Sequence, residues 1–112
     1  MGIQHWSDNI IILDLPEEPE MGEELEALVE MLSDRDHCSA VIDFSSVGGV
    51  VSSSSLSKLL ELRKTSLDCG RRLIFCGVPS ATRGVFKVTG LDQAFELADD
   101  KFTALATLEM IG

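Results

Sequence analysis

Four consecutive serines, Ser52–Ser55, lie near the middle of the sequence, between two valines and a leucine-rich segment. A serine that begins a helix can accept a hydrogen bond from a free backbone amide of the first turn, and a single residue is enough for such a cap. The same amides and the helix macrodipole also favour a phosphate group. The serines therefore predict either a cap with small polar neighbours or a cap that includes a regulatory phosphorylation site.

Three other residues have side chains that could do chemistry near these serines or elsewhere. Asp43 ends an apolar run shortly before the serines, where its carboxylate could cap the next turn or hold Ser45, or else contact a partner protein. His5 and His37 are the only histidines, and neither has a partner at the spacing of a metal site or a catalytic pair. We therefore expect no metal and no cofactor.

The segment from Cys76 to Arg83, CGVPSATR, resembles the phosphate loop of protein tyrosine phosphatases. The arginine lies one residue too far from the cysteine for that loop, and Pro79 lacks an amide that a phosphate cradle needs. We interpret Cys76 as a small apolar residue at the end of a buried strand and expect no enzymatic activity. Cys38, Cys69 and Cys76 include no close pair, which favours free thiols in a reducing cytoplasm.

The formal net charge is −10, and residues 1–36 account for all of it, with 11 acids and one arginine. This charge opposes binding to nucleic acid and to anionic lipid, and it favours a protein partner with a basic face. The acidic run from Glu20 to Glu26 is interpreted as a solvated helix face, and a dedicated partner surface is the alternative. Five basic residues of the second part could form a modest basic patch, and scattered solvated charges explain them equally well: Arg63, Arg71, Arg72, Arg83 and Lys87.

A length of 112 residues with 45% hydrophobic residues is typical of one domain, which we place at 1–112. No apolar run approaches the roughly 18 residues of a membrane span. The first residues lack the basic and apolar regions of a secretory signal. We therefore expect a cytoplasmic protein that does not act at a membrane.

The first half of the chain predicts a hairpin, a helix and a strand. The runs IQHWS and IIILDL are separated by the two turn residues Asp8 and Asn9, which is typical of a β-hairpin. After two prolines, apolar residues recur at helical spacing and predict one buried helix face: Leu25, Leu28, Val29 and Leu32. The next strand is expected from Ala40 to Phe44.

The second half alternates between helix and strand patterns. A helix is expected from Ser52 or Ser53 to a stop at Gly70, with one apolar face: Leu56, Leu59, Leu60 and Leu67. The run RLIFCGV predicts a strand buried on both faces. Pro79 is expected in the first turn of a helix that ends at Gly90. A short strand follows in AFELA, and then a helix opened by Asp99 and Asp100, with inward residues Phe102, Leu105 and Leu108.

This order of elements predicts an α/β fold with a mixed five-stranded sheet, in which an N-terminal hairpin is followed by parallel crossovers and about four helices. With these elements in place, the sequence resembles the STAS domain of bacterial anti-sigma factor antagonists. The resemblance covers roughly residues 37–110. It rests on the order and spacing of these residues: Asp43, Ser45, Leu56, Gly70, Leu73, Pro79, Phe86, Thr89, Gly90, Leu91 and Phe95.

The resemblance implies roles for the serines. In the family, an Asp-Ser-Ser-Gly-Leu motif opens the helix, and its first serine is phosphorylated by a partner kinase that is also an anti-sigma factor. When the motif is aligned on Leu56, the phosphoacceptor is Ser53, with Ser54 as the alternative. The expected partner-binding residues are Asp43, Ser52, Ser54 and Ser55.

Two departures from the family pattern favour a second hypothesis. Ser52 replaces the motif's Asp, and the segment VGGVV is one residue longer than the usual connection, which predicts a glycine bulge. The first hypothesis is a non-catalytic antagonist that binds an anti-sigma factor serine kinase and is switched by phosphorylation of Ser53. The second is a constitutive STAS scaffold or docking subunit of a larger assembly, without phosphorylation.

Overall fold

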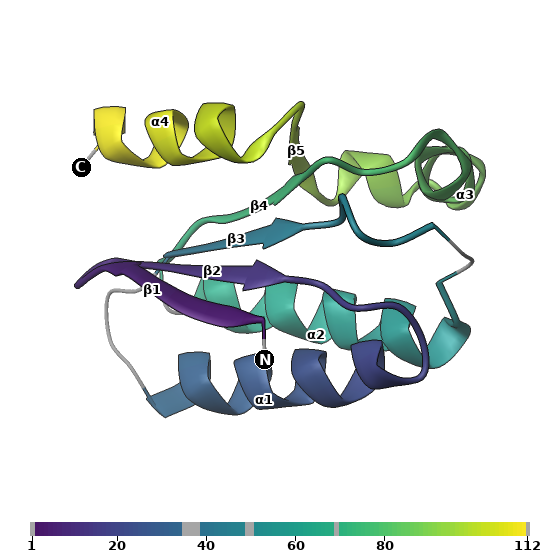
Figure 1. Cartoon of the computed structure of the whole chain (residues 1–112), viewed down its shortest axis with the longest axis horizontal. Coiled ribbons are helices and arrows are strands. Elements are labelled where there is room, and N and C mark those ends of the chain that lie inside the picture. Colours follow the sequence, from purple (N-terminus) through teal and green to yellow (C-terminus); the bar gives the residue numbers. More distant parts are fainter. Residues whose placement is uncertain (1, 35–38, 49–50, 69, 112) are drawn as a thin grey trace.

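The computed structural model describes the backbone of residues 2–34, 39–48, 51–68 and 70–111 (Figure 1). Its elements follow the predicted order. They are β1 Ile3–Ser7, β2 Ile10–Asp14, α1 Glu20–Asp34, β3 Ser39–Asp43, α2 Ser53–Asp68, β4 Leu73–Cys76, α3 Ser80–Thr89, the 3-10 helix η1 Leu91–Gln93, β5 Glu96–Ala98 and α4 Lys101–Ile111.

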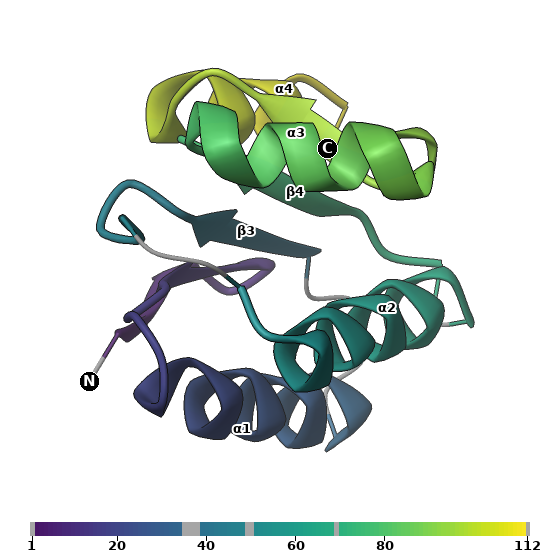
Figure 2. The same ribbon diagram turned by 90° about the vertical axis from the view of Figure 1, so that its right-hand side faces the viewer.

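The five strands form one sheet in the order β1-β2-β3-β4-β5. β1 and β2 pair antiparallel through the predicted turn at Asp8 and Asn9, and the other neighbours pair parallel. The expected mixed sheet with an N-terminal hairpin is therefore confirmed. Because β2, β3 and β4 run in the same direction, their carboxyl ends meet at one edge of the sheet. This edge lies on the side of the molecule that faces the viewer in Figure 2.

Both faces of the sheet are buried. Alternate strand residues, such as Leu13, Ile42 and Phe75, pack into the main core under α1 and α2. Their neighbours in sequence, such as Ile12 and Val41, pack into a second core under α4. This alternation follows from the period of two in a strand. The helices α1 and α2 lie side by side on one face and α4 lies on the other (Figure 1).

Four phenylalanines hold α3 and the last strand to the main core. Phe75 of β4 lies with its ring centroid 4.5 Å from Phe95 and 5.4 Å from Phe44. Phe86 of α3 packs 5.3 Å from Phe95 and nearly perpendicular to Phe44. Offset and edge-to-face ring pairs of this kind add to the free energy gained from burial.

The predicted inward face of α2 was partly wrong. Leu59 is buried, but Leu60 is 39% exposed and Leu67 is 58% exposed. The helix instead buries Ser55, Leu59, Leu62 and Ser66, which are spaced by four, three and four residues. The two serines are small enough to let α2 approach α1 and the sheet closely, so the inward face does not coincide with the richest leucine stripe.

Two further expectations needed correction. Phe102 of α4 is 81% exposed, because the second core lies under Ala104, Leu105 and Leu108 instead. Pro79 precedes the first helical residue of α3 rather than lying within its first turn, since its ψ of 154° is extended. Gly70 has a φ of +70°, as expected of a helix stop. The glycine bulge predicted in VGGVV, residues 47–51, includes residues 49–50, which lie outside the described residues, so it stays a prediction.

The corrected orientation of α2 gives the first test. Leu62→Ala should lower the free energy of unfolding by about 2–5 kcal/mol, because it removes a fully buried side chain and leaves a cavity. Leu67→Ala on the same helix should change it by about 0.5 kcal/mol or less. Urea denaturation followed by circular dichroism measures both values. Equal losses would mean that α2 is rotated toward the face that the leucine pattern predicts.

Candidate functional site

The carboxyl edge of the sheet brings three polar groups into one row. Asp14 is paired in register with Asp43, and Asp43 with Cys76. Lys101, the first residue of α4, bridges the two carboxylates, with its Nζ 2.9 Å from Asp14 Oδ1 and 3.6 Å from Asp43 Oδ2. The hydrogen bond to Asp14 raises the pKa of Lys101. The lysine therefore offsets the repulsion between neighbouring strand ends.

Asp43 is held on two sides, and its side chain is only 13% exposed. Its Oδ1 accepts hydrogen bonds from the backbone amide of Ser45, at 2.9 Å, and from the Ser45 hydroxyl. The expectation that Asp43 holds Ser45 is therefore confirmed. Gly77, at a φ of +63°, passes so close that a Cβ there would lie 2.5 Å from Ser45 Oγ. The turn after β4 thus requires glycine at this position.

Ser52 is the residue that caps α2. Its Oγ accepts a hydrogen bond from the backbone amide of Ser55 at 3.1 Å, and its carbonyl accepts the first helical bond, from the amide of Leu56 at 2.9 Å. This is the usual arrangement of an N-cap serine. The cap requires one serine, as the sequence predicted.

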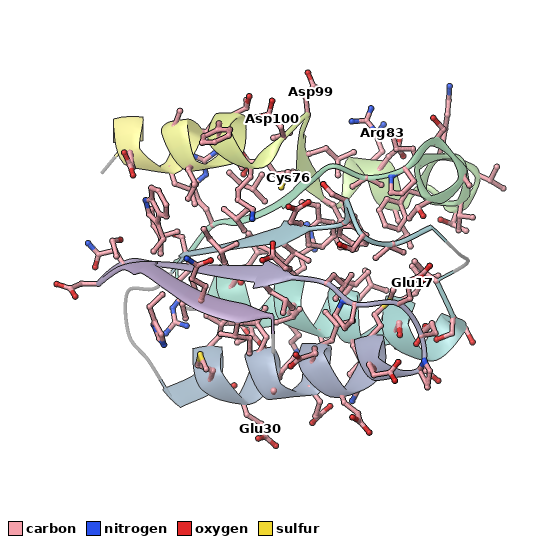
Figure 3. All side chains as sticks on the ribbon, in the orientation of Figure 1. Glu17, Glu30, Cys76, Arg83, Asp99 and Asp100 are labelled. Carbon is pink, nitrogen blue, oxygen red and sulfur yellow. The ribbon has the colours of Figure 1, made fainter. Side chains whose placement is uncertain are left out.

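A carboxylate from another part of the chain also occupies this helix start. Glu18, in the loop before α1, accepts hydrogen bonds at Oε2 from the Ser52 amide at 2.9 Å and from the Ser55 hydroxyl at 2.8 Å. The adjacent Glu17 accepts one at Oε1 from the amide of Gly48 at 2.9 Å. Figure 3 labels Glu17 at the same end of the molecule. The two glutamates therefore clasp the loop between β3 and α2.

Glu17 and Glu18 were not among the predicted site residues. Their positions between Pro16 and Pro19 marked them as part of a loop, and this was the only signal they carried. Hydrogen bonds from the Ser52 side chain, and further ones from the Ser52 amide and the Ser55 hydroxyl, lower the pKa of Glu18, while burial opposes this shift. The carboxylate is therefore charged at neutral pH and complements the positive end of α2.

The four serines thus divide into two pairs. Ser52 caps the helix, and Ser55 is fully buried and bound to Glu18, so these two are committed to the fold. Ser53 and Ser54 are the first two residues of α2 and are exposed. Within the described residues, neither hydroxyl makes a hydrogen bond. Their side chains are free to react or to contact another molecule.

The phosphatase-like alternative lacks its nucleophile. Cys76 is buried at the end of β4. Burial, followed by the charge of Asp43, raises the pKa of its thiol to about 12. Arg83 is turned toward Asp99, with Nη2 3.8 Å from Oδ1 (Figure 3). A protonated thiol is a poor nucleophile at neutral pH, which agrees with the interpretation of Cys76 as a packing residue.

The remaining candidates give no second centre at this edge. His5 is exposed, and His37 lies outside the described residues. In the described part of the chain no three metal-ligating side chains come together, and no helix is long and apolar enough to cross a membrane. Of the basic residues, Arg83 lies near the carboxyl edge, whereas Arg63, Arg71 and Arg72 gather around one hollow elsewhere.

A comparison with known protein families matches residues 7–104 to the STAS domain. The chain belongs to the STAS domain family. No curated protein matches its sequence. Ser53 and Ser54, which the resemblance gave as the phosphoacceptor and its alternative, are the first two residues of α2.

Solved structures give the same fold at low sequence identity. This STAS domain is similar to an anti-sigma factor antagonist domain protein from Planctomyces limnophilus, with a TM-score of 0.81 at 18% identity, over 96% of each chain. It is similar to a serine-to-glutamate variant of RsbS from Moorella thermoacetica, with a TM-score of 0.82 at 20% identity, over 97% of this chain and 94% of that one. It is also similar to the anti-sigma factor antagonist SpoIIAA in its unphosphorylated form, with a TM-score of 0.74 at 14% identity, over 98% of this chain and 96% of that one. The chain therefore has the fold of anti-sigma factor antagonists.

The contact of Glu18 with the start of α2 can be tested by charge removal. Glu18→Gln should lower the free energy of unfolding at pH 7 by about 1 kcal/mol, the scale of a solvent-screened hydrogen bond to a charged group. Because folding lowers the pKa of Glu18, its contribution is complete above the ordinary glutamate pKa and is lost as pH falls through the lowered one. The difference between the two proteins should shrink over that range.

The matched control for this test is Glu30→Gln. Glu30 is an exposed carboxylate of α1 that points away from the molecule (Figure 3). The substitution makes the same change in net charge and should alter the free energy of unfolding by about 0.5 kcal/mol or less. Urea denaturation at several pH values from about 3 to about 7 gives the free energy of unfolding of both variants. If both variants lose the same stability, the contact of Glu18 with Ser52 and Ser55 contributes nothing specific.

Cys76 gives a test of burial. Alkylation of the folded protein near pH 8 should leave Cys76 unmodified, because its thiol is buried and its pKa is raised to about 12. The protein unfolded in guanidinium should react fully at this residue. Peptide mapping by mass spectrometry reports both results. Rapid alkylation of Cys76 in the folded protein would revive the phosphatase-like interpretation.

Proposed function

We propose that this STAS domain is a non-catalytic regulatory protein of the anti-sigma factor antagonist type, and that phosphorylation of Ser53 switches its binding to a partner. The observation that carries the proposal is the division of the serines. Ser52 and Ser55 build the helix start, which leaves the hydroxyls of Ser53 and Ser54 exposed and without hydrogen bonds in the described structure. A kinase could modify either one without breaking the cap.

Ser53 is favoured over Ser54 by its alignment with the family motif. As the first residue of α2 it also lies where the helix dipole tolerates an anion best. Two of the similar proteins support a switch of this kind, since one is solved in an unphosphorylated form and another carries glutamate in place of a serine. Ser54 stays the alternative acceptor.

The proposed partner is an anti-sigma factor with serine kinase activity, and the phosphate comes from its nucleotide. The binding surface would include Ser54 and Ser52, with Asp43 at its margin. The buried Ser55 would contribute by holding Glu18 at this surface. We place this interaction in the cytoplasm, as the absence of a close cysteine pair favours. The acidic charge disfavours nucleic acid and anionic membranes as further partners.

Glu18 supports the proposal where the sequence departs from the family. Ser52 replaces the motif's Asp, yet the Oε2 of Glu18 lies 2.9 Å from the Ser52 amide. A carboxylate from another part of the chain thus binds the residue that precedes the proposed acceptor, where the family motif has its Asp. A phosphate on Ser53 would add nearly two negative charges at the helix start. A partner that places like charge or polar groups fitted to the uncharged serine against this position would then bind more weakly.

The test is binding of the host's anti-sigma factor kinase to three variants. Ser53→Ala should bind like the wild type, whereas Ser53→Asp should bind at least about tenfold more weakly, a loss of about 1.4 kcal/mol. Ser33→Asp, near the far end of α1, adds the same charge away from the site and should bind normally. Calorimetric titration gives the affinities, and circular dichroism checks the fold. Equal binding by Ser53→Ala and Ser53→Asp would refute the switch.

Phosphopeptide mapping of the protein purified from its own host tests the site directly. We expect a substoichiometric phosphate on Ser53. Phosphate found only on Ser54 would move the acceptor by one residue and keep the switch. Repeated absence of phosphate at both residues would contradict it.

One observation favours a second function, that of a constitutive scaffold or docking subunit of a larger assembly. With Ser52 as the cap and Glu18 already bound at the helix start, the polar groups of this edge are largely satisfied without phosphate. In that case a complex isolated from the host should be unchanged by phosphatase treatment and by Ser53→Asp.

A further inference from the structure

A hollow of about 160 Å³ lies at the opposite end of the sheet from the serines. It forms where α2 ends, beside the first residues of β4 and β5. Arg63, Ser66 and Leu67 of α2 line one side. The following turn and the strands add further residues: Arg71, Arg72, Leu73, Ala94 and Glu96.

The charged side chains of this hollow are unusual for so acidic a chain. Three arginines and one glutamate line it, a net of +2, whereas the whole chain carries −10. Glu96 pairs with Arg72. Arg63 donates to the carbonyl of Ala94, and Arg71 donates to the carbonyl of Leu32. Over the described residues, no carboxylate pairs with Arg63 or Arg71.

The same arginines carry donors that have no acceptor. Arg71 is 6% exposed and Ser66 is 2% exposed. Arg71 Nε, Arg72 Nη1 and Ser66 Oγ are buried, and none of them has a hydrogen-bond partner in the described part of the protein. Buried polar atoms without a partner are uncommon in native proteins, and a bound water or ion is one of the explanations for them. The three residues that carry these atoms, Ser66, Arg71 and Arg72, all line the same hollow.

We propose that this hollow is a binding site for a small oxyanion, such as the phosphoryl or carboxylate group of a metabolite. A guanidinium group presents two parallel N–H donors that match either group. The volume suits one such group rather than a whole nucleotide, because sites for drug-sized ligands begin near 300 Å³. The negative end of the α2 dipole opposes an anion here, but the amides of Gly70 and Arg71 already bind two of the last carbonyls.

The site is independent of the proposed serine switch, because it lies at the other end of α2. The experiment therefore uses the full chain labelled with ¹⁵N, titrated with inorganic phosphate and, separately, with acetate, with chloride holding the ionic strength constant. We expect saturable shifts of the amide signals of Ser66, Leu67 and Leu73. Saturation by phosphate alone assigns the site to a phosphoryl group, and saturation by acetate alone assigns it to a carboxylate.

Two arginine variants distinguish binding in the hollow from nonspecific binding of anions to surface arginines. Arg63→Gln should weaken the binding at least about tenfold, since it removes one guanidinium from the hollow. Arg83→Gln, which removes a charge near the serine edge, should leave it unchanged. If Arg63→Gln fails to fold, Arg63→Lys takes its place. It should also weaken the binding, because lysine lacks the two parallel N–H donors of a guanidinium group. The proposal is overturned if neither anion saturates, if the shifts scatter over the surface, or if Arg63→Gln binds as tightly as the wild type.

Discussion

The parallel pairing of β2, β3 and β4 determines which side chains lie at the carboxyl edge of the sheet, from which the serine-containing loop begins. Asp14, Asp43 and Cys76 end their strands side by side because the register aligns them. Two neighbouring carboxylates would repel each other at this edge, and Lys101 offsets that repulsion from the start of α4. The loop from β3 to α2 begins from this fixed edge, so the position of the serines follows from the pairing of the strands.

The start of α2 depends on a second contact, between two loops distant in sequence. Glu17 and Glu18 reach Gly48 and Ser52 across separations of 31 and 34 residues. Part of the acidic excess in the first third of the chain therefore has a structural use, as does Glu26, which pairs with Lys58 of α2. The acidic run from Glu20 to Glu26 is therefore not purely a solvated surface, because one of its carboxylates, Glu26, pairs with Lys58 of α2.

Local patterns in the sequence were enough to predict the order of elements, the serine cap, the burial of Cys76 and the contact of Asp43 with Ser45. Each of these depends on neighbours along the chain or on strand alternation. The role of Glu18 depends on how two loops fold together, and no local pattern encodes it. The orientation of α2 and the exposure of Phe102 were mispredicted because side-chain hydrophobicity alone does not show which face a neighbouring element covers. Small buried serines decided the first case.

The two buried serines, Ser55 and Ser66, lie near opposite ends of α2. The helix has 16 residues and spans about 24 Å. Ser55 near its start and Ser66 near its end both face inward, and both are almost fully buried. The first hydroxyl is satisfied by Glu18, and the second has no partner in the described structure. The first end is thus closed by the protein's own carboxylate, while the second presents arginine donors to a hollow. In the proposal, a bound oxyanion would accept hydrogen bonds at the second end, as the carboxylate of Glu18 accepts one from Ser55 at the first.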